Sequence, residues 1–108
     1  MTNSEILLNI HRYLHNTNFF YARVIDQSNS VTVDTILTVT KKLSTISSLN
    51  PDRYPTHILL LKNDLLKILP SPRHPEHYVY KTELEKLFSE CRARVKLPKQ
   101  LKPNPYLL

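Results

Sequence analysis

The sequence of 108 residues contains no glycine at all and only one cysteine. Without glycine the chain cannot form a glycine-rich phosphate loop, a G-x-G-x-x-G dinucleotide turn or a G-x-S-x-G nucleophile elbow. Glycine is also the residue that most readily adopts the positive φ of tight β-hairpin turns, so its absence argues against an all-β fold. These absences exclude several large enzyme classes and favour a helical protein.

Cys91 is the single cysteine, which rules out an intrachain disulfide and any site built on paired cysteines. We therefore expect an intracellular, reducing compartment, with the nucleus or cytoplasm favoured over mitochondria. Residues 6–25 carry two arginines and no acid, as a mitochondrial presequence would, but Glu5 and the lack of an Arg-rich start count against import. The longest apolar run, 58–61, is far shorter than the ~20 residues of a membrane helix, so we expect no membrane contact.

Apolar residues recur with the helical period of 3.6 in four parts of the chain. The predicted helices cover residues 4–26, 33–49, 56–69 and 82–95. The first helix is open to a break at 16–18, where short polar side chains compete with the backbone for hydrogen bonds. The third is apolar over most of its circumference and should lie at the centre, wrapped by the others. We predict an all-α domain of four or five helices over residues 1–96, as an orthogonal array or a bundle.

The start of the last predicted helix rests on a local signal. Thr82 and Glu85 have the spacing of a capping box, which marks a helix N-terminus. Prolines at 70, 72 and 75 predict an extended connector before it, in which His74 and His77 face solvent. Along the helix, the expected buried face consists of Leu84, Leu87, Phe88, Cys91 and Val95.

The positive charge is concentrated at the C-terminus. Residues 1–90 carry ten basic and nine acidic side chains, whereas 91–108 carry five basic and none acidic, within a formal net charge of +6. We expect residues 97–108 to form an extended, proline-punctuated basic tail. Three interpretations stay open: a nucleic-acid arm, a peptide that docks on a protein partner, or a tail that is solvated or packs back on the helices. The cations of the first are Arg92, Arg94, Lys96, Lys99 and Lys102, and the apolar anchors of the second are Leu97, Leu101, Tyr106, Leu107 and Leu108.

A second stripe runs along the first predicted helix, opposite its apolar face. It consists of Arg12, His15, Phe19 and Arg23, provided that the helix is unbroken. An exposed aromatic ring between two arginines is typical of a protein interface or a nucleic-acid contact. Alternatively, a break near residues 16–18 rotates Phe19 into the core.

The residues that could bind a metal or catalyse a reaction do not form a recognisable site in the sequence. His11 and His15 have the i,i+4 spacing of metal ligands, but zinc needs three or four ligands and Cys91 should face the core. Lys62 lies within an apolar helical sector. We expect its apolar stem to pack there and its ammonium to reach solvent, so that it does not act as a catalytic amine. No serine or cysteine has a base and an oxyanion turn nearby, so we predict no enzyme, metal, cofactor or small-molecule substrate.

The leading functional prediction is a non-catalytic subunit of an intracellular multiprotein complex, an adaptor or scaffold. A body of this size has little surface with which to cover the apolar third helix, so part of its apolar area should be buried against another chain. Docking would use an apolar helical face together with the tail. The alternative is a DNA- or RNA-binding module, in which the tail, Arg12 and Arg23 contact phosphates.

Overall fold

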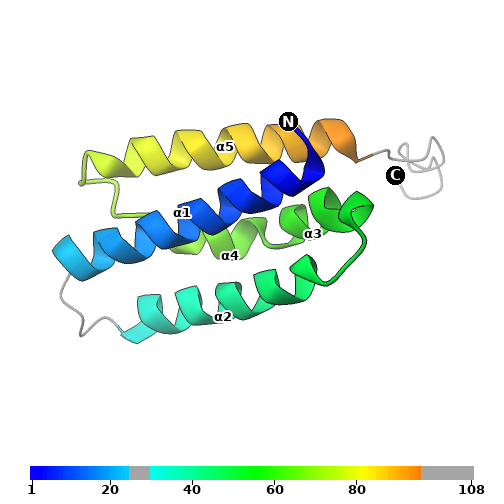
Figure 1. Ribbon diagram of the computed structural model, residues 1–108. Helices are drawn as coiled ribbons and strands as arrows, with labels where there is room; N and C mark the ends of the chain where they lie inside the picture. The colour runs from blue at the N-terminus through cyan, green and yellow to red at the C-terminus, as the bar shows by residue number, and fades with distance from the viewer. Residues whose placement is uncertain (25–29, 96–108) are drawn as a thin grey trace, which may run out of the picture.

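The computed structural model describes residues 1–24 and 30–95, which form an all-α fold (Figure 1). Its helices are α1 (Asn3–Val24), α2 (Ser30–Ser47), the 3-10 helix η1 (Pro51–Arg53), α3 (Tyr54–Leu60), α4 (Lys62–Lys67) and α5 (Glu76–Arg94). The predicted fold class is therefore confirmed. The predicted tail, 97–108, lies outside the described residues, as does Lys96.

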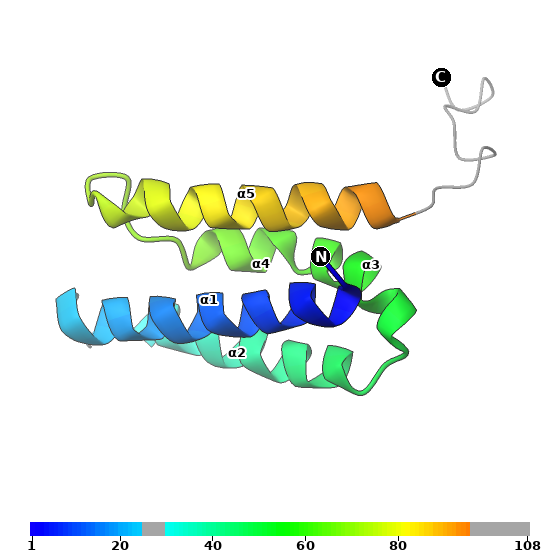
Figure 2. The ribbon, with the colours of Figure 1, turned by 45° about the horizontal axis from the view of Figure 1, so that its top comes forward.

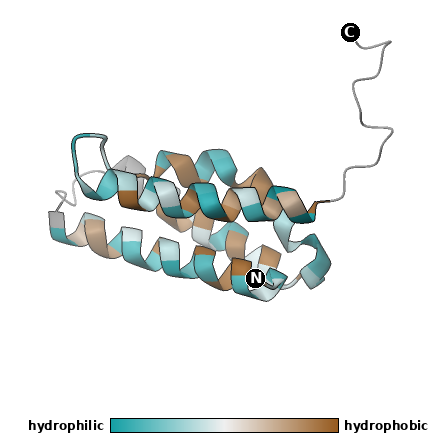
Figure 3. Cartoon of the chain, turned by 90° about the horizontal axis from the view of Figure 1, so that it is seen from above, coloured by the Kyte–Doolittle hydropathy of each residue, from teal (hydrophilic) through white to brown (hydrophobic). Residues whose placement is uncertain are grey.

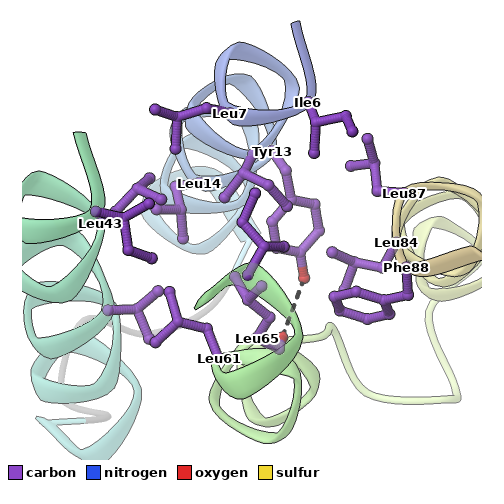
Figure 4. Close-up of a cluster of buried hydrophobic side chains, with 14 of the residues drawn as sticks. Ile6, Leu7, Tyr13, Leu14, Leu43, Leu61, Leu65, Leu84, Leu87 and Phe88 are labelled. Carbon is purple, nitrogen blue, oxygen red and sulfur yellow. Dashed lines mark hydrogen bonds between the residues drawn. The ribbon is translucent and has the colours of Figure 1, made fainter. Parts of the chain in front are cut away.

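The helices form an up-and-down bundle in which α1, α2, the pair α3–α4 and α5 run alternately in opposite directions (Figures 1 and 2). Helices α3 and α4 follow one another and together occupy the place of the third helix. Seen along the bundle, α1 faces α3 and α4 across the core, while α2 and α5 lie on either side (Figure 4). Of the two arrangements left open by the sequence, the chain adopts the bundle.

Helix α1 is continuous through its polar centre. Thr17 is fully buried, and its hydroxyl donates to the carbonyl of Tyr13 at 2.8 Å, one turn earlier in the same helix. A carbonyl oxygen has two lone pairs, so Tyr13 can accept this hydroxyl as well as the helical amide of Thr17, and the hydroxyl is satisfied without a break in the helix. The alternative with a break at 16–18 is wrong. The face that packs into the core consists of Ile6, Leu7, Ile10, Tyr13, Leu14, Thr17 and Phe20.

Helix α2 buries a narrower face than its sequence predicts. By helical period the sequence places Val33 and Leu37 in the same apolar sector as Ile36, yet they are 44% and 56% exposed. The residues that are buried alternate in steps of three and four along the helix: Ile36, Val39, Leu43 and Ile46. Leu37 follows Ile36 directly, so it is rotated by about 100° from that stripe and emerges on the surface.

The third predicted helix is divided at Leu61. The Leu61 amide donates to the carbonyls of His57, Ile58 and Leu59, which tightens the turn between α3 and α4. The pair of helices contacts α1, α2 and α5, which confirms its predicted central position. The other helices cover most of the apolar surface of α3 and α4. Leu60, 74% exposed, is the one large apolar side chain of this pair that stays exposed. The expected apolar excess is therefore much smaller than predicted.

Helix α5 begins six residues before the predicted start. Thr82 is an exposed residue in the helix interior, so its capping-box spacing marks no terminus here. The N-cap is Pro75, whose φ of −56° is already that of a helix. The first turn is also tied to α1, because Arg23 pairs with Glu76 at 2.8 Å.

The connector before α5 packs against the bundle instead of facing solvent. His77 and His74 were predicted to be solvated, and both are half-buried. The Nδ1 atom of His77 lies 2.7 Å from the carbonyl oxygen of Pro70, and the His74 ring packs edge-on against Phe20 at 5.5 Å. These contacts fold the proline-rich segment back over the end of α1.

The core draws side chains from every side of the bundle (Figure 4). At its centre the hydroxyl of Tyr13 donates to the carbonyl of Leu65 at 3.4 Å. Four residues of the predicted face of α5 are buried, namely Leu84, Leu87, Phe88 and Cys91. The fifth, Val95, is the C-cap of the helix and only half-buried. Burial raises the pKa of the Cys91 thiol to about 11, so the thiol stays protonated at neutral pH.

Candidate functional site

The solvent side of α1 carries an exposed line of large side chains. We call it the outer α1 stripe, and it consists of Leu8, Arg12, His15, Phe19 and Arg23. Steps of three and four residues keep these positions on one side of a continuous helix. Leu8 is 47% exposed and Phe19 60% exposed. Phe19 therefore lies on the surface, and the alternative in which it turns into the core is wrong.

The ring of Phe19 is held in place on that surface. The His15 ring, one turn earlier, packs edge-on against it with 4.6 Å between the ring centres. Farther along the stripe, the guanidinium of Arg23 pairs with Glu76, and both side chains are exposed. An exposed pair of this kind contributes little to stability.

An open groove lies beside the stripe, between α1 and α5. It encloses about 300 Å³ and is lined by Met1, Asn9, Arg12, Tyr13, Asn16, Glu83, Lys86 and Leu87. Tyr13 and Leu87 are buried side chains at its base, while Arg12 and Lys86 are exposed on opposite helices. Within residues 1–24 and 30–95, neither of these two cations belongs to an ion pair. Figure 3 shows the face on which α1 and α5 lie side by side.

Apolar side chains continue both edges of this groove toward the end of α1. Phe19 lies one turn beyond Asn16 on α1, and Val79, 56% exposed, lies one turn before Glu83 on α5. Between them, the hydroxyl of Tyr80 donates to the carbonyl of Asn16 at 3.2 Å and joins the two helices. The groove and the stripe thus form one continuous surface with an apolar base, amide and charged edges, and an exposed aromatic ring.

The cations of the nucleic-acid interpretation are divided between several environments. Arg94 is held by the carboxylate of Glu90 at 3.0 Å and by the side-chain oxygen of Asn3 at 3.1 Å. Arg23 has its pair with Glu76, whereas Arg12 and Arg92 are exposed. The remaining candidates lie outside the described residues: Lys96, Lys99 and Lys102. The same holds for the predicted apolar anchors Leu97, Leu101, Tyr106, Leu107 and Leu108.

The structure also places the lysine and the histidines that the sequence offered as catalytic or metal-ligating candidates. Lys62 is half-buried, and its ammonium lies 5.7 Å from the centre of the Phe88 ring in a cation–π contact. His11 and His15 are exposed on α1, and across residues 1–24 and 30–95 no three metal-ligating side chains gather. None of the helices described has the length and apolarity needed to cross a bilayer.

Comparisons of this chain with protein families, with curated proteins and with solved structures find no match. What the protein does must therefore be inferred from its own surface.

Two parts of this surface were missed at the level of sequence. Leu8 precedes Arg12 by four residues, so extending the predicted stripe by one turn would have included it. The groove needs the pairing of α1 with α5, which brings Lys86 and Leu87 next to Tyr13 across more than seventy positions of sequence. Helical periodicity carries no signal for that pairing.

Proposed function

We propose that this chain is a non-catalytic protein–protein interaction subunit, an adaptor or scaffold, and that it docks through the outer α1 stripe and the adjoining α1–α5 groove. The observation that carries the proposal is Phe19, which is 60% exposed between two arginines on a continuous helix. Aromatic and arginine side chains are enriched among the residues that dominate protein interfaces.

The physical gain from covering this surface is considerable. Burying a phenylalanine side chain fully contributes roughly 1.5–3 kcal/mol, of which the exposed part of Phe19 is available to a partner. Because the ring stands on a rigid helix and is braced by His15, little side-chain entropy is lost when the partner binds. Arg12 and Lys86 can then form charge-assisted hydrogen bonds at the edges of the interface.

The predicted apolar anchors of the tail remain part of this proposal as a second contact, and they are supported by the sequence alone. The nucleic-acid module remains the alternative function. Its support is weaker, because Arg23 and Arg94 are already engaged with Glu76 and Glu90.

The test is the native size of the protein in an extract of its own cells, with and without nuclease. We expect a species well above twice the chain mass of 12.7 kDa that survives nuclease. Phe19→Asp should shrink it, whereas Leu60→Asp, at a side chain 74% exposed on α3, should not. Collapse on nuclease treatment would establish the nucleic-acid module instead. A large species whose size is not changed by Phe19→Asp would place the docking surface elsewhere.

A further inference from the structure

We propose that the outer α1 stripe binds a second copy of itself in antiparallel orientation and forms a two-fold symmetric dimer. This inference rests on the proposed function, because it names one occupant of the same docking surface. A two-fold interface brings one patch onto an identical patch, so the patch must be complementary to itself when reversed.

The apolar positions of the stripe meet this requirement. When the two-fold axis passes midway between Tyr13 and Leu14, Leu8 lies opposite Phe19 of the partner subunit, and Arg12 lies opposite His15 of the partner subunit. The steps of four, three and four from Leu8 to Phe19 are those of a seam along which two helices pack side by side. Both large apolar side chains of each stripe are then covered, and symmetry makes each contact twice.

Charge selects the antiparallel orientation. Glu5 is exposed at one end of the helix and Arg23 at the other. Antiparallel pairing sets Glu5 beside Arg23 of the partner subunit, whereas parallel pairing would set acid against acid and arginine against arginine. The guanidinium has five N–H donors, so Arg23 can keep its bond to Glu76 and donate to a second carboxylate.

The dimer should be weak. One pair of helices covers less than the roughly 1,200 Å² at the lower limit of stable complexes, and only Leu8 and Phe19 supply large apolar contacts. We therefore expect a dissociation constant on the order of tens of micromolar, as in transient associations.

Sedimentation equilibrium of the full chain from about 1 µM to about 1 mM spans this range. The average mass should rise from 12.7 kDa toward twice that value with concentration. Phe19→Asp should weaken association by about tenfold or more, because it removes one of the two large apolar side chains of each stripe and sets a charge in its place. Leu37→Asp is the matched control, since Leu37 is 56% exposed on α2, and it should leave association unchanged. A chain that stays monomeric throughout, or a dimer that Phe19→Asp leaves intact, overturns the proposal.

Cross-linking tests the orientation. A Leu8→Cys protein mixed with a Phe19→Cys protein should form an intersubunit disulfide under mild oxidation. Neither protein alone should do so, because identical positions lie about 16 Å apart along the paired helices, beyond the reach of a disulfide. The native Cys91 is fully buried and does not compete. Linkage of Leu8→Cys to itself would overturn the antiparallel arrangement. A monomer in solution that still joins a large, Phe19-dependent complex in extracts would refute self-association and leave the proposed function standing.

Discussion

Removal of the Tyr21 hydroxyl should lower the free energy of unfolding by about 1 kcal/mol. This hydroxyl lies 3.0 Å from the carbonyl oxygen of Ile68 and 2.8 Å from that of Leu69, just after α4. Carbonyls at a helix C-terminus lack partners within the helix, so α1 supplies a donor that they need. A hydroxyl has one proton and shares it between the two acceptors. The loss in Tyr21→Phe should therefore be that of one net hydrogen bond, roughly 0.5–1.5 kcal/mol.

The burial of Tyr21 determines whether the loss of stability lies at the upper or the lower end of this range. Tyr21 is half-buried, and desolvation raises the pKa of its phenol. Water can reach part of the site in the variant, so the carbonyls do not incur the full penalty of an unsatisfied buried group. For a domain of this size, 1 kcal/mol corresponds to a fall in Tm of about 4–8 °C.

Urea denaturation followed by circular dichroism measures this difference, with an unchanged dependence on urea as the sign of intact two-state unfolding. The matched control is Tyr78→Phe, because Tyr78 is 64% exposed and its hydroxyl has no hydrogen bond within the described residues. Equal stability of the two variants would refute the link between α1 and the end of α4.

Four further predictions follow from the packing and charge of single side chains. Phe88 is 1% exposed, so Phe88→Ala should lower the free energy of unfolding by about 3–5 kcal/mol, measured by urea denaturation. Burial raises the pKa of Cys91 from 9.0 to about 11, so stability should fall as pH rises from 9 toward 11, where the unfolded thiol loses its proton first; a flat pH profile contradicts this. The hydrogen bond from Lys42 lowers the pKa of Asp64, so the pair stabilises the fold above the unfolded pKa, and this contribution is lost as pH falls through the folded value. Asp64→Asn should accordingly flatten the acid limb of a stability–pH curve. Thr82→Ala should change thermal stability by less than about 0.5 kcal/mol, against the ~1 kcal/mol expected at a true N-cap.

The interiors of the helices could be predicted from sequence because burial repeats with the helical period. Leu84, Phe88 and Cys91 lie on the buried face that their spacing predicts. The solvent position of Phe19 depended on whether α1 is continuous, and this could not be decided from the sequence. The deciding contact is the buried hydroxyl of Thr17 on its own helix, and its burial depends on tertiary packing.

The ends and joints of the helices could not be predicted for a different reason. The spacing of Thr82 and Glu85 is shared by helix starts and helix interiors, and only the contacts around Pro75 place the start of α5. The turn at Leu61 contains no proline, and the polar residues 62–64 that follow it are equally typical of the solvent face of a continuous helix. The division lies where α3 and α4 pack against three other helices. The groove depends on the same information, because it exists only once α1 and α5 are paired.

Exposure alone does not distinguish the proposed docking surface, because single apolar side chains on the surface are common. Leu60 is more exposed than Phe19 and lies beside a hollow of about 240 Å³ between α2 and α3. The polar groups there are already engaged, since Lys42 pairs with Asp64 and the His57 ring lies 2.9 Å from the Arg53 carbonyl oxygen. Around Phe19, by contrast, Arg12 and Lys86 are without ion pairs among the described residues, and Leu8 and Val79 extend the apolar surface. A partner at Leu60 would gain one apolar contact, whereas a partner at Phe19 gains several together with free charges, which is why the two aspartate substitutions should differ.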